Sequence, residues 1–338
     1  GGGVSGGAER VLDALRRTEG EPCSGEGHSE LLQVSRSQIW KHVETLRAKG
    51  YGITGAPGGG YRLISVPDRL YPEEILEGLE TRWMARDISH FETIDSTNRV
   101  GFDLAREGAP HGTVVIAEGQ TAGRGRLGRS FYSPPHRNLY TSVVLRPSLS
   151  ASQAATVILA AAIAVAETGA ASLGSPRAVE IKWPNDVLLD GLKTSGILME
   201  LSAEATRVGF LILGIGVNLN VDRDAFPEEF RSLATSLASH SGRPVDRVHF
   251  TRRLFVTLEQ VLDVHAERGW DALRPRFQEF FRMSGRRIRV SDLAEGEIAG
   301  ICRGIDPDGA LRLERLDGEQ VRVLAGDVTI IKDGAPPA

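Results

Sequence analysis

The chain has 338 residues, of which 41% are hydrophobic and 25% charged, a composition typical of a soluble protein with two or three globular domains. Its formal net charge of −4 excludes a protein whose whole surface binds polyanions, so contact with nucleic acid has to come from a local basic patch. The two cysteines, Cys23 and Cys302, lie far apart without partners at metal-ligand spacing, which excludes a disulfide framework and indicates a reducing compartment.

The N-terminal pattern is that of a winged helix-turn-helix. The first residues, Gly1–Gly7, lack the features of a secretion signal and are interpreted as a flexible leader. Helices are predicted at 9–17, from Ser24 to about Leu32, and at 36–49, where Ser35 caps the third helix and Gly50 ends it. Two short strands, 51–53 and 61–63, flank the glycine-rich turn 56–60. In this plan the third helix enters the major groove of DNA.

The third predicted helix carries groups suited to binding DNA. It has four Lys or Arg residues against Glu44 alone, a local excess of positive charge in an acidic chain, as phosphate binding requires. The candidate DNA-binding residues at and near its start are Ser35, Arg36, Ser37, Gln38, Lys41 and His42. The alternative is a small three-helix domain that merely presents a solvated basic face.

A linker bounded by Pro67 and Pro72 leads into alternating strands and helices, which predict a central domain with one sheet. Strands are predicted at 90–94, 112–118, 139–145, 179–183, 187–189, 193–201 and 208–219. Helices are predicted at 72–79, 151–167, 228–240, 248–268 and 270–283, and a further helix follows 95–98 and ends near 107. The longest apolar stretch, 154–166, has 13 residues, fewer than the about 20 that a membrane-spanning helix needs, and predicts a buried helix. We therefore expect a cytoplasmic protein without membrane contact.

After Gly285 the sequence changes to short alternating strands. They are predicted at 287–290, 297–303, 310–314, 320–324 and 328–331, with Asp- and Gly-containing turns between them. This pattern predicts a small C-terminal β-barrel.

The strongest functional motif is the arginine loop, Gly119–Arg129, which reads Gly-Gln-Thr-Ala-Gly-Arg-Gly-Arg-Leu-Gly-Arg. Its glycines free the backbone to present N–H groups to an anion, and Arg124, Arg126 and Arg129 add guanidinium groups for carboxylate or phosphate oxygens. The glycines also match the dinucleotide pattern G-x-G-x-x-G, but that pattern has to open a helix, and Pro134-Pro135 prevents one. The alternative is a solvated basic surface loop.

Further polar groups are predicted at strand ends, where open sheets place ligands: Ser96-Thr97-Asn98, the Asp186 turn and Lys193. These hydrogen-bond donors can bind anions, but the Walker phosphate pattern is absent from the sequence. This combination suggests a site that binds a carboxylate next to a nucleotide phosphate, as in activation of an acid by adenylation. Since no Ser-His-Asp or Cys-His set is apparent, we expect catalysis by positioning and electrostatics. Each group also has a structural alternative: a helix N-cap, a turn residue and a surface lysine, respectively.

Four motifs make the chain resemble the biotin protein ligases. They are Asp-Ser-Thr-Asn at 95–98, Gln-Thr-Ala-Gly-Arg-Gly-Arg-Leu-Gly-Arg at 120–129, Lys-Trp-Pro-Asn-Asp at 182–186 and Lys-Thr-Ser-Gly-Ile-Leu at 193–198. With the winged helix, the chain resembles the bifunctional bacterial form, which also represses the biotin operon. The resemblance covers nearly everything after Gly7 and implies an α+β protein: an N-terminal winged helix-turn-helix, a central mixed sheet with helices as in class II aminoacyl-tRNA synthetases and biotin ligases, and a C-terminal SH3-like β-barrel.

We accordingly divide the chain into a leader (1–7), a DNA-binding domain (8–65), a linker (66–72), a catalytic domain (73–283) and the barrel (284–333). The resemblance implies that biotin and ATP form biotinyl-5′-AMP with release of pyrophosphate. The biotinyl group then passes to one lysine of the biotin carboxyl carrier domain of acetyl-CoA carboxylase. Mg²⁺ is expected with the ATP, without a metal site of the protein's own. Operator DNA and a second copy of the chain, as a homodimer, are further expected partners.

By the same resemblance, the biotin and adenylate site is lined by Ser96, Thr97, Asn98, Gln120, Arg124, Gly125, Arg126 and Lys193. Arg124, Arg126 and Lys193 are expected to be catalytic, and Asp186 to orient or deprotonate the incoming lysine amine. Arg129 and Asn218 are expected to contact the nucleotide.

Two positions depart from the family pattern: His28 and Gln33 stand where its helix-turn-helix has an apolar residue and a glycine, which bears on DNA affinity. Two other functions remain open. One is a DNA-binding regulator whose ligase fold only senses biotin, and Arg124, Arg126 and Lys193 argue against it. The other is a lipoate or octanoate transferase of the same superfamily, whose own signature is missing while the arginine loop is present.

Overall fold

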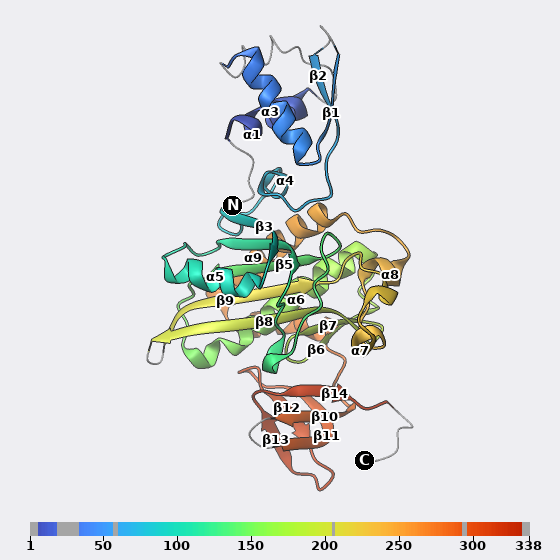
Figure 1. Ribbon diagram of the computed structural model, residues 1–338. Coiled ribbons are helices and arrows are strands. Elements are labelled where there is room, and N and C mark those ends of the chain that lie inside the picture. The colour runs from blue at the N-terminus through green and yellow to red at the C-terminus, as the bar shows by residue number, and fades with distance from the viewer. Residues whose placement is uncertain (1–5, 19–33, 57–59, 205–206, 293–295, 333–338) are drawn as a thin grey trace.

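The computed structural model describes residues 6–18, 34–56, 60–204, 207–292 and 296–332. It arranges them in three tiers (Figure 1): the winged domain, a seven-stranded sheet with its helices, and a small antiparallel sheet. The whole is an α+β protein, as predicted.

The winged domain is built from four described elements. These are α1 (Gly6–Arg17), α3 (Arg36–Ala48), β1 (Gly52–Ala56) and β2 (Gly60–Ser65), the two strands pairing antiparallel. The predicted cap of α3 is confirmed, since Ser35 Oγ accepts the Gln38 N–H and the Gln38 side chain accepts the Ser35 N–H, both at 3.2 Å. The helices bury a core of their own, formed by Val11, Leu12, Leu15, Ile39, Val43 and Leu46. The predicted helix from Ser24 to Leu32, with Cys23, His28 and Gln33, lies outside the described residues.

Residues 66–71, within the predicted linker, are bound to the central domain by hydrogen bonds. The Leu70 N–H donates to Glu118 Oε2 over 3.0 Å. Arg247 donates to Asp68 Oδ1 at 3.0 Å and to Glu118 Oε1 at 2.9 Å. Because Glu118 and Arg247 are buried, this segment is held in place by charged groups that water does not reach.

Side-chain contacts also join the winged domain directly to the middle tier. Tyr71 stacks against Tyr51, with ring centroids 6.4 Å apart. Glu74, in α4 (Pro72–Leu76), accepts the Tyr51 hydroxyl over 2.6 Å and pairs with Arg16 of α1. Arg252 donates to the Glu74 carbonyl from the helix behind it. These contacts fix how the two domains sit relative to each other.

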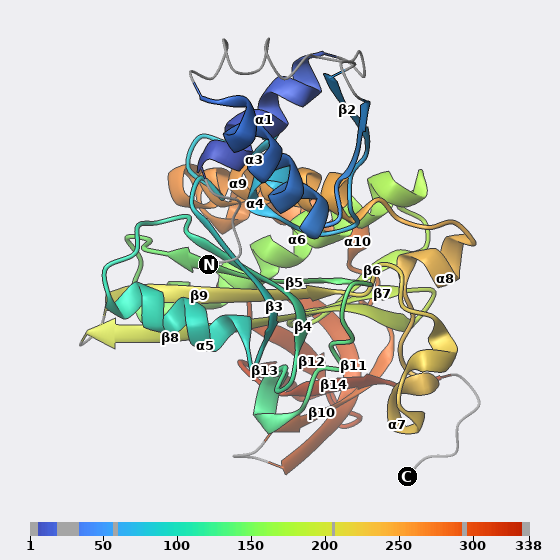
Figure 2. The same cartoon turned by 45° about the horizontal axis from the view of Figure 1, so that its top comes forward.

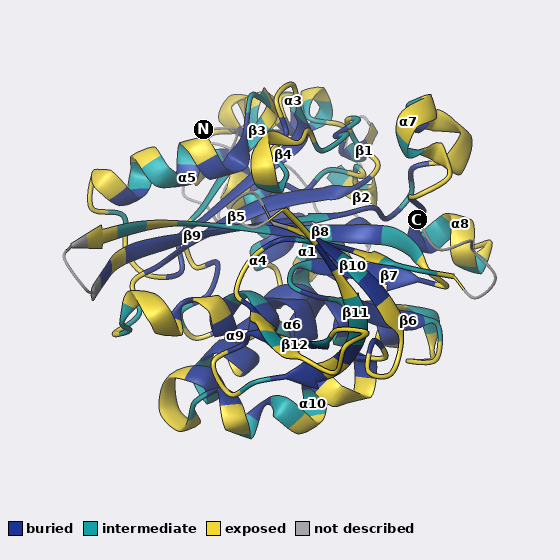
Figure 3. Cartoon of the chain, turned by 90° about the horizontal axis from the view of Figure 1, so that it is seen from below, coloured by how far each residue is buried: buried dark blue, intermediate teal, exposed yellow. Residues whose placement is uncertain are grey.

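The middle tier is a seven-stranded sheet. Its strands, in spatial order, are β3 (Ile88–Ile94), β4 (Val114–Gln120), β5 (Leu139–Leu145), β9 (Arg207–Val217), β8 (Leu192–Glu204), β7 (Asp186–Leu189) and β6 (Val179–Lys182). Strands β3 and β4 pair in parallel, and α5 (Thr97–Arg106) connects them across one face; the other neighbours pair antiparallel. The other face is covered by α6 (Ala155–Leu173), α9 (Arg247–Arg268) and α10 (Arg274–Phe280), as Figures 2 and 3 show.

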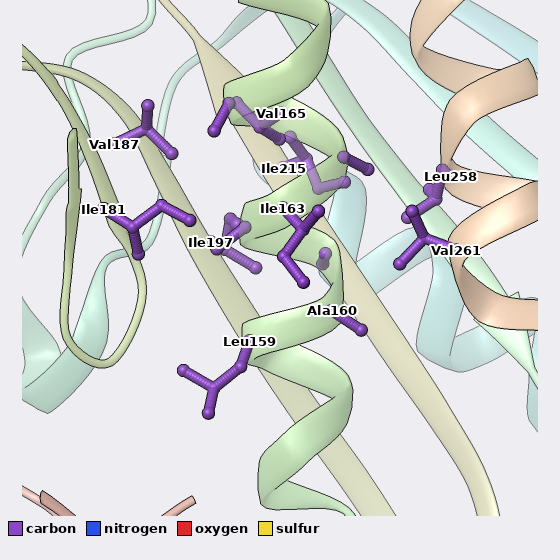
Figure 4. Close-up of a cluster of buried hydrophobic side chains, with 14 of the residues drawn as sticks. Leu159, Ala160, Ile163, Val165, Ile181, Val187, Ile197, Ile215, Leu258 and Val261 are labelled. Atoms are coloured by element: carbon purple, nitrogen blue, oxygen red, sulfur yellow. The ribbon is translucent and has the colours of Figure 1, made fainter. Parts of the chain in front are cut away.

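The core lies between this sheet and the α6–α9 pair (Figure 4). Side chains of α6 point both to the sheet and to α9; the cluster includes Leu159, Ile163, Val165, Ile197, Ile215, Leu258 and Val261. The run of alanines along α6 lets the neighbouring helix approach closely, which keeps this part of the interior densely packed. Because the sheet covers one side of α6 and α9 another, this helix has no polar face.

The buried helix predicted for this segment is confirmed, but it is longer than the apolar stretch from which it was predicted. The apolar stretch of 13 residues is part of a helix of 19, preceded by a 3₁₀ turn, Ala151–Gln153. Together, Ala151–Leu173 are long and apolar enough to cross a membrane, but 78% of the most apolar window is buried inside the protein. Burial against the sheet and α9 is the property of a core helix.

The predicted helix 228–240 is also wrong, because the chain forms two short helices there, α7 (Glu228–Arg231) and α8 (Leu237–Ser241). The break has a cause in the sheet. Residues Ala234 and Thr235 pair with Lys193, whose carbonyl accepts the Thr235 N–H over 2.9 Å. Ser236 then caps α8 by accepting the Ser239 N–H.

The third tier is the predicted C-terminal domain. Its strands β10 (Arg287–Asp292), β11 (Gly296–Ile305), β12 (Leu311–Glu314), β13 (Gln320–Val323) and β14 (Asp327–Ile330) form one antiparallel sheet in the order β13-β12-β11-β10-β14. It is attached to the middle tier through Trp183, whose buried Nε1–H donates to the Gly309 carbonyl over 2.9 Å.

Candidate active site

A pocket open to solvent lies on the α5 side of the sheet. Its walls come from the start of α5, the arginine loop, the first half of β8 and the end of β9. They are lined by Ser96, Thr97, Asn98, Gln120, Arg124, Gly125, Arg126, Phe131, Tyr140, Asn185, Lys193, Gly196, Ile197, Leu198, Gly214, Ile215 and Gly216. All eight residues expected in the biotin and adenylate site are among them. The pocket lies at the edge of the sheet where β4 ends at Gln120, β8 begins at Leu192 and β9 ends at Val217, so these polar groups lie near strand ends, as the sequence predicted.

The start of α5 is positioned by a dense set of hydrogen bonds. Ser96 caps the helix, and the Thr97 N–H donates to Gln120 Oε1 over 2.9 Å. Asn98 Nδ2 donates to the Leu198 carbonyl at 3.2 Å and to Glu200 Oε1 at 3.1 Å. Asn98 Oδ1 lies 2.6 Å from Ser142 Oγ. The amide of Asn98 is therefore saturated by protein partners, which fixes α5 over β8.

Two glycines of β9 make room for this arrangement. A side chain at Gly214 would collide with the Asn98 amide. One at Gly216 would come within 2.7 Å of the Phe131 ring, which follows the arginine loop. Because residues two apart in a strand point to the same face, these glycines leave space above one face of β9 that Asn98 and Phe131 occupy.

The arginine loop closes on itself and is anchored on both sides. The Gly125 N–H donates to the Arg129 carbonyl over 2.7 Å, and the Phe131 N–H to the Gly123 carbonyl over 2.8 Å. Leu127 has a φ of +57°, a left-handed conformation rare for a branched residue. Gln120, just before the loop, donates from Nε2 to Ser133 Oγ, just after it.

Each arginine of the loop faces a carboxylate. Arg124 Nη1 lies 3.6 Å from Glu200 Oε1, on the outer part of β8. Arg129 Nη2 lies 2.6 Å from Asp327 Oδ2 and Arg126 Nη1 lies 3.7 Å from Asp327 Oδ1, so both reach the C-terminal domain. Burial lowers the pKa of Arg126, and the nearby carboxylates of Asp327 and Asp186 counteract that shift. The three arginines of the loop are thus paired with protein carboxylates, which a bound anionic substrate could replace.

Lys193 and Asp186 lie side by side at the edge of the pocket. Lys193 Nζ is 3.2 Å from Asp186 Oδ1, and Lys182 Nζ is 3.6 Å from Asp186 Oδ2. The ammonium group of Lys193 also lies 5.7 Å from the centre of the Phe131 ring. Asp186 is buried and contacts the pocket through Lys193 instead of lining it.

The two expected nucleotide contacts lie outside the pocket lining. Arg129 is largely exposed and reaches Asp327. Asn218 is buried: its N–H donates to the Thr194 carbonyl over 2.7 Å, and its Oδ1 accepts from Asn138.

Sequence reasoning missed Phe131, Tyr140 and Asn185 in the lining and Glu200 beside it. The glycines at 214 and 216 were the available signal, because their spacing marks one face of a strand, and a large side chain has to fill the space they leave. Phe131 fills the space at Gly216, and its ring makes an edge contact with that of Tyr140, with centroids 6.3 Å apart.

The expected DNA-contacting residues lie on α3. Arg36, Ser37, Gln38 and Lys41 are exposed, as is Ser35, while His42 is half-buried beside Gly7 of α1. The exposed Trp40 lies among them and was not predicted from the sequence. Part of the predicted positive charge is used within the domain, since Arg47 donates to the Ile53 carbonyl and to Glu44.

No group of three or more His, Cys, Asp or Glu side chains within the described ranges is placed to hold a metal ion. The protein itself therefore offers no preformed metal site there. A cation at this pocket would depend on ligands that arrive with a substrate.

Comparison with known proteins gives three matches along the chain. The model of the biotin/lipoate A/B protein ligase family matches residues 90–218, that of the biotin protein ligase C-terminal domain 283–330, and that of an HTH domain 8–62.

Relatives match over nearly the full length. The bifunctional ligase/repressor BirA of Bacillus spizizenii is 35% identical over 320 residues, which cover 95% of this chain and 97% of that protein. The BirA of Escherichia coli is 32% identical over 311 residues, covering 92% and 94%. Among solved structures, the biotin protein ligase from Aquifex aeolicus in complex with biotin and ATP is similar, with a TM-score of 0.63, 27% identity and coverage of 73% of this chain and 100% of that one.

Proposed function

The chain belongs to the family of bifunctional biotin protein ligases and repressors, and we propose how its own residues carry out both activities. The observation that carries the proposal is that Lys193, Arg124 and Arg126 converge with the polar start of α5 on one pocket. Substrates with a polar ring system at one end and an acid at the other fit such a lining.

In the first step, a carboxylate oxygen of biotin attacks the α-phosphorus of ATP. The bond from this phosphorus to the β-phosphate oxygen breaks, and pyrophosphate leaves. Both reactants are anionic, so the step needs positive charge where they meet. We propose that Arg124, Arg126 and Lys193 supply it, since guanidinium and ammonium groups bind carboxylate and phosphate oxygens through charge-assisted hydrogen bonds.

The polar wall selects biotin. Gln120 and Thr97 are already joined by a hydrogen bond, and Ser96 Oγ accepts the Arg99 N–H while keeping its own O–H for another acceptor. Groups held in this way lose little freedom when a ureido ring binds. Because Asn98 is saturated by Ser142, Leu198 and Glu200, we assign it to positioning the wall.

In the second step, a lysine amine of the carrier domain attacks the acyl carbon of biotinyl-5′-AMP. The bond from that carbon to the phosphate oxygen breaks, an amide forms and AMP leaves. We propose that Asp186 orients Lys193 toward the adenylate and takes up the proton that the amine loses. Arg129 is proposed to contact the nucleotide from the rim of the pocket. Asn218 is buried and hydrogen-bonded to Thr194, so we propose that it holds the backbone next to Lys193 in place.

Mg²⁺ would accompany ATP, bound by its phosphates and water, in keeping with the absence of an acidic cluster in the described part of the chain. The proposed protein substrate is the biotin carboxyl carrier domain of acetyl-CoA carboxylase. The cytoplasm, where ATP and this carrier are found, is the proposed location.

The winged domain is proposed to bind operator DNA through Arg36, Ser37, Gln38 and Lys41, with Ser35 holding the helix start and His42 packed against α1. A homodimer on a two-fold operator is the matching assembly, since palindromic half-sites mirror a two-fold protein. Mobility shift with and without biotin plus ATP tests whether DNA binding waits for the adenylate.

The ligase proposal is tested by biotin-dependent exchange of pyrophosphate into ATP. Arg124→Ala and Arg126→Ala are each expected to slow exchange about 100-fold, as the loss of one electrostatic donor does in other enzymes. Arg99→Ala is the matched control, because Arg99 is an exposed arginine on α5 paired with Asp95 and Asp103. Undiminished exchange in both loop variants would overturn the proposal.

A further inference from the structure

Helix α3 exposes one large apolar side chain. Trp40 is 53% exposed, whereas Ile39, Val43 and Leu46 of the same helix are fully buried. Within the described residues, no aromatic ring packs on Trp40, and its Nε1–H has no hydrogen-bond acceptor. Tryptophan is highly buried on average, and it is enriched among the residues that dominate the binding energy of interfaces. This side chain is therefore suited to contact a partner outside the chain.

Helical geometry places Trp40 beside the groups that are proposed to contact DNA. Arg36 stands four residues before it and Ser37 three, so the three side chains share one surface of the first two helical turns. Lys41 follows directly and is also exposed. In helix-turn-helix proteins, residues near the start of the recognition helix reach the edges of the bases. Trp40 lies within that region.

The flank of α3 that carries Trp40 is the one beside the β1–β2 hairpin (Figure 1). Arg47 stands seven residues after Trp40, hence on the same stripe of the helix, and donates to the Ile53 carbonyl of β1 over 2.7 Å. Arg47 also pairs with Glu44 at 2.6 Å, which reduces the repulsion between that carboxylate and a phosphate. With Arg36 and Lys41 nearby, the surroundings of Trp40 suit a polyanion better than an apolar protein surface.

We propose that Trp40 reads thymine in the operator: its indole ring packs against the C5-methyl group of a thymine in the major groove. This methyl group is the apolar feature that distinguishes thymine there, and apolar side chains contact it. Arg36 and Lys41 are cations and supply affinity through phosphates, whereas the uncharged ring supplies base preference. The inference rests on the proposed binding of operator DNA by α3 and adds a specificity determinant to it.

The test needs an operator, which is first selected from random duplexes by the full-length protein with biotin and ATP. Each thymidine of this duplex is then replaced in turn by deoxyuridine, which keeps the base pair and removes only the methyl group. At one thymidine in each half-site, the affinity of the original protein is expected to fall about fourfold, the effect of losing the burial of one methyl-sized group.

Trp40→Ala is expected to bind the selected operator about tenfold more weakly, within the usual effect of a mismatched base pair. At the thymidine that the ring contacts, deoxyuridine is expected to cause no further loss in this variant, because both changes remove the same contact. Since the ring carries no charge, the slope of log affinity against log salt is expected to stay the same.

Two further variants separate base reading from other roles. Trp40→Phe keeps an aromatic ring and is expected to retain most of the affinity and the response to deoxyuridine. Val66→Ala is the matched control, because Val66 is an apolar residue outside α3 with a similar exposed fraction, 50%, and its operator affinity is expected to be unchanged. Pyrophosphate exchange is expected to be equal in all variants, which shows that each is folded.

Unchanged operator affinity in Trp40→Ala overturns the inference, and so does a response to deoxyuridine that persists in this variant at every position. A smaller sedimenting mass of Trp40→Ala in the absence of DNA would assign the ring to a contact between copies and would also overturn it. These results leave the proposed DNA binding intact as long as Lys41→Ala still weakens it. If the original protein enriches no duplex, DNA binding itself fails, and this inference fails with it.

Discussion

Lys193 and Asp186 form an ion pair between the neighbouring strands β8 and β7, with Nζ 3.2 Å from Oδ1. Asp186 is buried, and its other oxygen lies 3.6 Å from Lys182 Nζ. One carboxylate therefore holds two ammonium groups at the edge of the pocket. This pair joins the two proposed steps, since Lys193 is proposed to act in the first and Asp186 in the second.

We expect Asp186→Asn to slow transfer of the biotinyl group about 100-fold while pyrophosphate exchange changes less than about threefold, because only transfer releases a proton from an amine. Labelling of a carrier domain from preformed biotinyl-5′-AMP measures transfer alone. An equal loss in both assays would show that Asp186 acts only by holding Lys193.

Gly216→Ala is expected to raise the Kd for biotin about tenfold, since overpacking a filled site costs on the order of 1–3 kcal/mol. The new methyl group would come within 2.7 Å of the Phe131 ring. Gly209→Ala in the same strand is the control, because its Cβ would meet only the Ser202 backbone, at 3.2 Å. Calorimetric titration with biotin gives the comparison; equal affinity in the two variants would contradict a pocket floor at this point.

Glu118 couples stability to acid pH. Burial alone would raise the pKa of its carboxyl, but the hydrogen bond from His90 and the charge of Arg247 outweigh burial and lower the pKa from 4.5 to about 2. A carboxyl with a lowered pKa in the folded state contributes stability that is complete above the unfolded value, about 4.5. This contribution is lost as the pH falls from about 4.5 toward 2.

Glu118→Gln is accordingly expected to lower the free energy of unfolding by about 3 kcal/mol at pH 7, because it removes the buried carboxylate partner of Arg247 and leaves only Asp68, which is exposed. The difference from the original protein should shrink between pH 4.5 and 2. Urea unfolding across this range measures it, and Glu92→Gln serves as the exposed control. A difference that is independent of pH would indicate lost packing and not lost charge.

Lys41→Ala on α3 is expected to weaken operator binding and to reduce the slope of log affinity against log salt by about one, the result of losing one phosphate contact. Arg10→Ala is the control, since Arg10 is an exposed cation on α1. Mobility shift at two salt concentrations is the measurement, and exchange activity should be the same in both variants. A slope identical to that of the original protein would place Lys41 outside the interface.

Local signals in the sequence predicted the parts of the fold that short stretches determine. Ser35 and Gln38 stand three residues apart before an apolar run, and they form the cap of α3. Likewise, the motifs around Gln120 and Lys193 predicted residues that line one pocket.

The parts that sequence reasoning missed depend on partners distant in the chain. The residues around Lys193 carry no sequence signal for its pairing with Ala234. That pairing interrupts the predicted helix 228–240. Glu200 and Asp327 belong to the site only because folding brings them to Arg124 and Arg126. Periodicity describes one element at a time, so it cannot report such contacts.

Helix α6 is apolar on nearly every side, and α9, the helix it contacts most, ends about a hundred residues later in the chain. At synthesis rates of about 5–20 residues per second, the ribosome needs roughly 5 to 20 s to supply that partner. During this interval a nascent segment with the composition of a membrane span stays uncovered. Holdase chaperones, which bind exposed apolar chain, are therefore expected to limit the yield of folded protein in a cell. Substitutions that weaken or slow the packing of α9 on α6 should lower this yield before they lower the activity of the folded protein.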